Sequence, residues 1–303
     1  MKKKALITGG AGFIGSHVKD ELKKLNFEIL SVGRNKKEDV QADFKAPEFK
    51  NIILDFMPDV VCHFGSGSNI ARAEENKEKE FEDTVLSTQV LIKYLLELKK
   101  KPEKIIYLST QAVYGCSDIL SVGESHEVKP VTAYGENKLK AENIIINSNL
   151  NYIIFRISSV YGATQDYLKS GVIAKFVNRM KNNQSPIVFN SIDNFSDFIY
   201  IDDVVNGIMK GITSGDEVKN EIFNLASGKP TTLREVLDIL YGYFPSVLQP
   251  ELQINTLYPG KNSKGIYLDI KKIKSKLQWD CKYNIEDGLA SMLKTMSLLE
   301  NVR

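Results

Sequence analysis

A glycine-rich turn near the start of the chain restricts the possible folds most strongly. An apolar strand pattern leads directly into residues 8–15 (TGGAGFIG), and an amphipathic helical pattern follows. Gly9 permits the left-handed backbone of a tight turn, and Gly12 lacks a Cβ that would hold a pyrophosphate away from the main chain. The helix that follows presents free N–H groups to negative charge. With a second apolar run at 27–32, the pattern predicts a βαβ unit that binds a dinucleotide.

Composition is consistent with a globular enzyme of one or two domains, since the 303 residues are 43% hydrophobic and 26% charged. The 40 basic and 38 acidic residues are spread along the chain, so we expect no nucleic-acid partner and no membrane partner. Cys62, Cys116 and Cys281 lack metal-ligand spacing, which predicts free thiols and no metal site. Neither an export signal nor a long apolar run is found, so we expect a cytoplasmic protein.

Strand and helix patterns alternate through the first half of the chain. Apolar runs at 60–64, 105–108 and 152–156 predict strands, and amphipathic stretches at 81–98 and 134–146 predict helices. Strands separated by helices form parallel sheets that are covered on both faces. The expected fold is therefore α/β, a doubly wound parallel sheet of the Rossmann type.

The alternation weakens after residue 162, where a polar segment, a short helix from Asp202 and a strand at 222–226 precede a mixed, proline-containing region. We interpret this region as a smaller, interleaved C-terminal substrate domain. The expected division is a dinucleotide-binding domain at 1–162, to which 197–226 returns, and a substrate domain at 163–196 and 227–303.

A tyrosine and a lysine four residues apart form the second informative pattern. Tyr134 and Lys138 lie on one face of the predicted helix. A free phenol has a pKa of about 10, and a nearby cation stabilises the phenolate and moves that pKa towards the working range. Thr110 ends a predicted strand, where open α/β sheets place ligands, and its hydroxyl can bind a substrate oxygen. Thr110, Tyr134 and Lys138 are therefore the expected catalytic residues.

These motifs and several others resemble the extended short-chain dehydrogenase/reductases, specifically the nucleotide-sugar epimerase, dehydratase and reductase group. The resemblance covers nearly the whole chain. It extends through the segments at 8–15, 43–44, 63–66, 108–115, 124–138, 156–162, 197–203 and 277–279. It implies that Tyr134 is the acid–base residue, that Lys138 holds the nicotinamide ribose, and that Thr110 orients the substrate oxygen.

The resemblance also implies which residues contact each ligand. For the cofactor these are Gly9, Gly12, Phe13, Ile14, Gly15, Arg34, Asn35, Asp43, Phe44, Phe64, Gly65, Ser66, Tyr134, Lys138 and Ile157. For the substrate they are Gln111, Ser159 and Phe189. Phe189 borders the nucleotide base in relatives, although an ordinary buried strand residue would give the same pattern. Relatives dimerise through the helices that correspond to 81–98 and 134–146, so a homodimer is expected.

The end of the second strand decides the expected cofactor. NAD-preferring members of the group carry an acidic residue there, whereas this chain has Val32-Gly33-Arg34-Asn35. Without a carboxylate nothing repels a 2′-phosphate, and Arg34 offers a planar fork that suits one. We therefore favour NADP. NAD is the alternative, with Arg34 stacked on the adenine or directed into solvent.

The residues after Thr110 exclude one reaction of the group. Dehydratases of the group have a sequence like Thr-Asp-Glu at these positions. This chain has Gln111 and Ala112, and neither can act as an acid or a base. With NADP favoured, we expect a reductase of a nucleotide-linked 4-keto-6-deoxy sugar, with hydride delivered to C4 and Tyr134 as the acid. The alternative is a nucleotide-sugar 4-epimerase with bound NAD.

The diphosphate clamp of the group is altered, because Ser196 and Tyr258 stand where many members carry arginine. Lys261 and Lys264 could supply positive charge instead. A reductase of a non-nucleotide carbonyl substrate is thus a second alternative. A cofactor-binding regulator or a structural subunit would not need the complete proton-transfer set.

Overall fold

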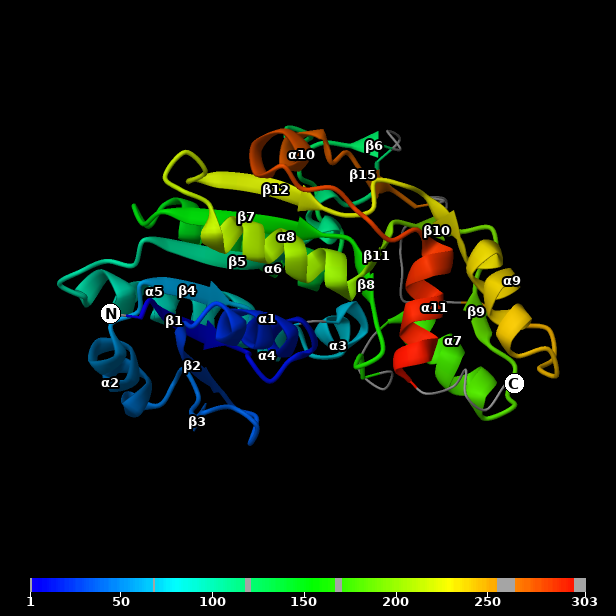
Figure 1. The fold of residues 1–303 in the computed structure, drawn as a ribbon, viewed down its shortest axis with the longest axis horizontal. Helices are drawn as coiled ribbons and strands as arrows, with labels where there is room; N and C mark the ends of the chain where they lie inside the picture. The colour runs from blue at the N-terminus through cyan, green and yellow to red at the C-terminus, as the bar shows by residue number, and fades with distance from the viewer. Residues whose placement is uncertain (1, 68, 118–120, 167–170, 255–264, 297–303) are drawn as a thin grey trace.

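The structure is a computed structural model and describes residues 2–67, 69–117, 121–166, 171–254 and 265–296. Its centre is a seven-stranded parallel sheet in the order β12-β7-β5-β4-β1-β2-β3 (Figure 1). The strands are β1 (Lys4–Thr8), β2 (Glu28–Gly33), β3 (Val40–Gln41), β4 (Val60–His63), β5 (Lys104–Thr110), β7 (Tyr152–Ile157) and β12 (Glu221–Leu225). The predicted doubly wound parallel sheet is confirmed.

Helices cover both faces of this sheet. On one face lie α1 (Phe13–Lys24) and α8 (Ile201–Thr213), and on the other lie α2 (Pro47–Phe56), α5 (Ser87–Glu97) and α6 (Ala133–Ile146). In β1, Ala5 and Ile7 belong to the first core and Leu6 to the second. Because both faces are buried, such a strand reads as a continuous apolar run rather than an alternating one.

The parallel register brings the carboxyl ends of the central strands to one edge. Thr8 pairs with His63 and Thr110 pairs with Ile157 at these ends. Beyond this edge lies a smaller region that contains α7 (Val172–Lys181), α9 (Leu233–Tyr243) and α11 (Ile285–Thr295) (Figure 1). It also holds two short strand pairs, β9 (Ile187–Phe189) with β14 (Glu251–Gln253), and β10 (Phe195–Ser196) with β13 (Thr231–Thr232). The space between the two parts is therefore bounded by the strand ends.

The remaining elements connect these parts. They are α3 (Ile70–Glu75), α4 (Lys77–Phe81), the π-helical turn η1 (Glu82–Leu86), the 3₁₀ turn η2 (Gln111–Tyr114), α10 (Lys271–Leu277), and the strand pairs β6 (Ser121–Val122) with β15 (Tyr267–Leu268) and β8 (Ser159–Tyr161) with β11 (Phe198–Tyr200). The described part of the chain contains no helix with the length and apolarity needed to cross a bilayer.

Two helices differ from their predictions. The single helix expected at 81–98 is interrupted by η1, where the hydroxyls of Ser87 and Thr88 each donate to a carbonyl one turn earlier, at 2.6 Å. Such π turns add one residue to a helix and often occur near functional sites. The helix from Asp202 was expected to be short, but α8 has 13 residues because its apolar face continues to Ile212.

Two buried aspartates fasten the C-terminal segments to the sheet. The Asp197 carboxylate accepts N–H bonds from Ser227 at 2.8 Å and from Leu268 at 3.1 Å. The Asp203 carboxylate accepts them from Lys282 at 3.1 Å and from Tyr283 at 2.9 Å. The family-like segment at 197–203 thus has a structural role in this chain.

Candidate active site

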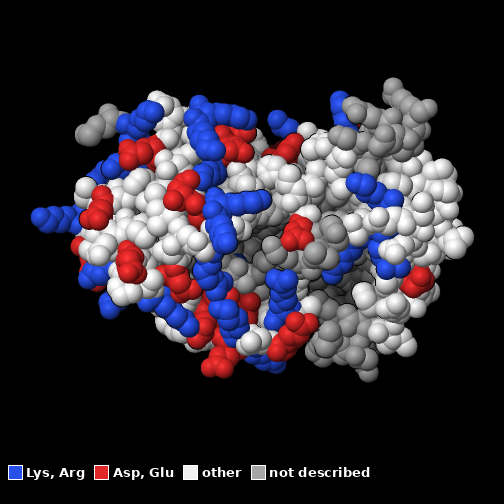
Figure 2. Space-filling view, turned by 90° about the horizontal axis from the view of Figure 1, so that it is seen from below, with Lys and Arg blue, Asp and Glu red and all other residues white. Residues whose placement is uncertain are grey.

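One cavity runs along the carboxyl ends of the strands. The cavity has a volume of about 1920 Å³. It is lined by every residue that the sequence assigns to catalysis, to the cofactor or to the substrate. Small-molecule pockets typically measure roughly 300–1,000 Å³, so this cavity has room for a dinucleotide and a second ligand. Seen from below, a hollow opens between the two parts, and charges of both signs are interspersed over that face (Figure 2). Tyr258, Lys261 and Lys264 lie outside the described residues.

The glycine turn forms a cradle that a side chain would fill. Gly9 has φ +73°, and a Cβ at Gly15 would lie 2.2 Å from the Gly9 carbonyl oxygen. The residue before α1 is Gly12, which offers no side-chain cap, and the first turn of α1 contains no acidic residue. The first N–H groups of α1 are therefore available to a diphosphate, so this turn fits a dinucleotide.

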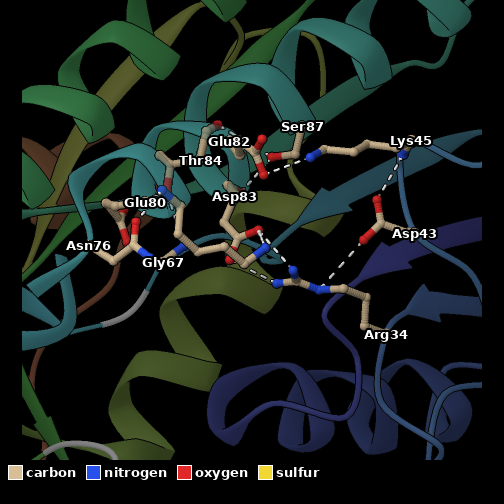
Figure 3. A network of polar contacts seen from close by, with 11 residues as sticks. Arg34, Asp43, Lys45, Gly67, Asn76, Glu80, Glu82, Asp83, Thr84 and Ser87 are labelled. Atoms are coloured by element: carbon tan, nitrogen blue, oxygen red, sulfur yellow. Dashed lines mark hydrogen bonds and ion pairs between the residues drawn. The ribbon is translucent and has the colours of Figure 1, made fainter.

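Arg34, from the end of β2, is already engaged by acidic side chains. Its Nη1 and Nη2 each donate to an Asp83 carboxylate oxygen at 2.9 Å, and its Nε lies 3.9 Å from Asp43 (Figure 3). Asp83 also accepts from Lys79 at 2.9 Å. The expected preference for NADP rests on an Arg34 guanidinium that is free to bind a 2′-phosphate. Because this guanidinium binds Asp83 instead, the structure gives no support to that preference.

Tyr134 lies in the first turn of α6, whose start is fixed by its neighbours. The Thr132 hydroxyl accepts the Gly135 N–H at 3.1 Å, and Glu74 accepts the Ala133 N–H at 2.7 Å. Burial raises the pKa of Tyr134 because it disfavours the phenolate, while a hydrogen bond from Thr110 acts in the opposite direction. The structure therefore places the Thr110 and Tyr134 hydroxyl groups side by side in the cavity.

Lys138 is close to Tyr134 but directs its ammonium elsewhere. The Nζ atom donates to Ser66 Oγ at 2.6 Å and to the Leu108 carbonyl at 2.7 Å, and lies 5.8 Å from the centre of the Tyr134 ring. Burial lowers the pKa of Lys138 to about 8. The sequence-based expectation that Lys138 lowers the Tyr134 pKa is wrong for this arrangement, because burial of the phenol has the larger effect.

Two buried groups near Lys138 support the site without taking part in proton transfer. His63 is held between the hydroxyls of Thr8, at 2.8 Å, and Thr88, at 2.9 Å, and burial lowers its pKa to about 3. It is therefore neutral at physiological pH. Glu80 accepts the Thr84 hydroxyl at 2.7 Å, and Thr84 accepts the Gly67 N–H at 3.0 Å (Figure 3).

We expect turnover to fall as pH rises above about 8. Lys138 carries its charge only below its pKa of about 8, so its ammonium is lost above that pH. Tyr134 does not replace that charge, because loss of its proton can only add a negative one. A pH–rate profile from 6 to 10 measures the effect, and Lys138→Arg, which stays charged, should move the fall to higher pH. A constant rate up to pH 9.5 would contradict the assignment.

The three residues that were expected to contact the substrate, Gln111, Ser159 and Phe189, line the cavity. The Gln111 side-chain oxygen is buried and has no hydrogen-bond partner within the described ranges. Ser159 Oγ lies 2.7 Å from Ser196 Oγ. Ser196, which stands where many members of the group carry an arginine, therefore forms a hydroxyl pair with Ser159 in this chain. Phe189 is 46% exposed, which rules out the reading of an ordinary buried strand residue.

Several charged residues that line the cavity were not predicted, and two of them, Lys175 and Glu38, bear on the expected ligands. Lys175, on α7, is the cation that the described residues place at the substrate end, and Glu38 lies at the nucleotide end. Lys175 has no distinctive spacing in the sequence, and Glu38 belongs to a charged run that is typical of a solvated turn. Only the tertiary fold brings either side chain to the cavity.

Comparisons with known proteins agree with this geometry. A model of the NAD dependent epimerase/dehydratase family matches residues 5–226. A Methanocaldococcus jannaschii protein named "Putative UDP-glucose 4-epimerase" is 32% identical, over 96% of this chain and 97% of its own length. A dTDP-4-dehydro-6-deoxyglucose reductase of Escherichia coli is 28% identical, over 97% of this chain and 98% of its own.

A solved structure has the same architecture over almost the whole chain. UDP-glucose 4-epimerase of Thermotoga maritima, crystallised with UDP-glucose, has a TM-score of 0.89 and 25% identity, covering 98% of this chain and 99% of that one. The family match spans more than half of the chain, including the glycine turn, Thr110, Tyr134 and Lys138. The chain therefore belongs to the NAD-dependent epimerase/dehydratase family, within the extended short-chain dehydrogenase/reductases, and is an enzyme of the oxidoreductase type.

Proposed function

We propose that the chain is a nucleotide-sugar 4-epimerase that retains NAD. The observation that carries this proposal is the adjacency of the Thr110 and Tyr134 hydroxyls in the cavity that the glycine turn also lines. A named 4-epimerase and a solved 4-epimerase among the relatives support it. The proposal replaces the reductase as the preferred reading, because the engaged Arg34 removes the argument for an exchangeable NADPH.

The residues have separate tasks in such a reaction. NAD held over the glycine turn would supply reversible hydride transfer at C4 of the sugar. Tyr134 would act as its phenolate, taking the proton of the C4 hydroxyl and giving it back, and Thr110 would hold the same oxygen. Burial disfavours that phenolate, so the positive charge of the bound cofactor would be needed to stabilise it. Lys138 would bind the nicotinamide ribose. Phe189, exposed at the far end, would contact the nucleotide base.

A retained cofactor and a redox-neutral reaction distinguish the epimerase from a reductase. Protein purified without added nucleotide should release NAD on denaturation, and should interconvert UDP-glucose and UDP-galactose without added cofactor. A panel that includes dTDP-linked hexoses would identify the preferred base. An empty protein that consumes NADPH with a 4-keto-6-deoxy nucleotide sugar would instead establish the second candidate, which the 28% identity to the E. coli reductase favours.

Lys175→Met tests whether the substrate carries a diphosphate. If Lys175 binds it, loss of one charge-assisted hydrogen bond should raise KM for UDP-glucose about tenfold and leave kcat nearly unchanged. Lys181 lies on the same helix but outside the cavity lining, so Lys181→Met is the matched control. An unchanged KM would show that Lys175 does not bind the diphosphate. Homodimerisation, the division into two domains and a cytoplasmic location stay predictions.

A further inference from the structure

A buried carboxylate lies beside the glycine turn, although β2 ends without an acidic residue. Glu38 follows β2 in a turn in which its N–H binds the Asn35 carbonyl at 3.1 Å. Its side chain folds back over the end of the strand, so that a Cβ built on Gly33 would lie 3.1 Å from Glu38 Oε1. A Cβ built on Gly10 would lie 3.1 Å from Oε2. The carboxylate thus fills the space that a side chain at Gly33 would enter.

The contacts of Glu38 leave one oxygen unused. The residue is 9% exposed, and Oε1 accepts the Ala11 N–H at 2.8 Å. Oε2 is buried and has no hydrogen-bond partner among the described residues. A carboxylate can accept more hydrogen bonds than the one from Ala11, so this position suits a ligand that supplies hydroxyl groups. The residue lines the same cavity as the glycine turn.

The cations around the nucleotide end do not offset this charge. Arg34 forms an ion pair with Asp83, and Lys45 Nζ lies 2.6 Å from Glu82 Oε2 (Figure 3). Lys19 lies 2.7 Å from Asp39. A 2′-phosphate would therefore have to displace Asp83 from Arg34 while approaching Glu38. Of the other lysines that line the cavity here, Lys23 lies 3.0 Å from Asp20, whereas Lys37 is exposed and is the candidate to attract a phosphate.

We propose that Glu38 accepts hydrogen bonds from the adenosine ribose and repels a 2′-phosphate, so that it selects NAD over NADP. The carboxylate reaches the turn from the loop after β2, five residues beyond Gly33. This assignment rests on the proposed function only in that a nicotinamide dinucleotide is the cofactor. It does not depend on which sugar reacts.

Calorimetric titration of the full chain, freed of nucleotide, tests the assignment. The wild-type protein should bind NAD⁺ at least tenfold more tightly than NADP⁺. Glu38→Gln keeps the size and one acceptor oxygen but removes the charge, so it should strengthen NADP⁺ binding about tenfold and change NAD⁺ binding less than that. Glu48→Gln removes an exposed carboxylate of α2 that does not belong to the cavity lining, and should leave the ratio unchanged. Lys37→Ala shows whether that lysine attracts the phosphate.

A comparison of ligands tests the hydrogen bond itself. Wild-type protein should bind ADP-ribose about fivefold more tightly than 2′-deoxy-ADP-ribose, and Glu38→Ala should abolish that difference. The wild-type titrations need no variant to fold. Tighter binding of NADP⁺ by the wild type, or an unchanged ratio in a folded Glu38→Gln, would overturn the role of Glu38 alone. Binding of neither dinucleotide would refute the proposed function as well.

Discussion

Replacement of Tyr134 by Phe is expected to lower turnover by about 10²–10⁴-fold, the usual contribution of a positioned acid or base. The substitution removes one hydroxyl and keeps the ring, whose surroundings in the first turn of α6 are fixed by Thr132 and Glu74. The fold and the binding of NAD should therefore persist. Turnover of UDP-glucose and a titration with NAD⁺, measured on the same preparation, separate the two effects.

Tyr107→Phe is the matched control for this experiment. Tyr107 is also fully buried, its hydroxyl has no hydrogen-bond partner among the described residues, and it lies outside the cavity lining. Its ring lies 5.1 Å from Lys138 Nζ and would be kept. Loss of that hydroxyl should leave turnover within about threefold of wild type, since it serves no proton transfer. Wild-type turnover in Tyr134→Phe would exclude Tyr134 as the acid–base residue.

The parts of the molecule that sequence predicts well are those encoded by short segments. The glycine turn combines a positive φ at Gly9 with a close approach at Gly15, and both requirements can be read from adjacent residues. Strands buried on both faces, such as β1 and β5, appear as apolar runs. Thr110 and Tyr134 reach one cavity because parallel register brings strand ends to one edge, which follows from the fold class.

The parts that sequence misses depend on which side chains meet. Arg34 was assigned to a phosphate from its chemistry alone, but its partner Asp83 lies 49 residues away on a π turn that helical periodicity does not reveal. Glu38 was absent from the expected site because only the return of the chain after β2 brings it to Ala11. Lys138 lines the cavity, yet the direction of its ammonium depends on Ser66 and Leu108 from other elements.

Loss of the Glu142 carboxylate should give the largest effect on stability, because it belongs to a buried ion pair beneath the active site. Glu142, on α6, is fully buried and accepts from Arg156 Nε at 3.0 Å and Nη2 at 2.7 Å. Ser109, next to Thr110, also donates to it. The pair joins the helix that carries Tyr134 and Lys138 to strands β5 and β7. It therefore fixes the Tyr134 and Lys138 side chains relative to the sheet.

Glu142→Ala is expected to lower the free energy of unfolding by about 3–5 kcal/mol, because it leaves the Arg156 guanidinium buried without its counter-charge. Urea denaturation measures the change. Asp193→Ala breaks an exposed Arg–carboxylate pair, with Arg234 at 2.9 Å, and should cost less than about 1 kcal/mol. The double variant Glu142→Leu with Arg156→Met should recover most of the loss, since an apolar pair avoids the desolvated charge. Stability of Glu142→Ala within about 1 kcal/mol of wild type would show that water reaches Arg156 and that the pair does not hold α6 in place.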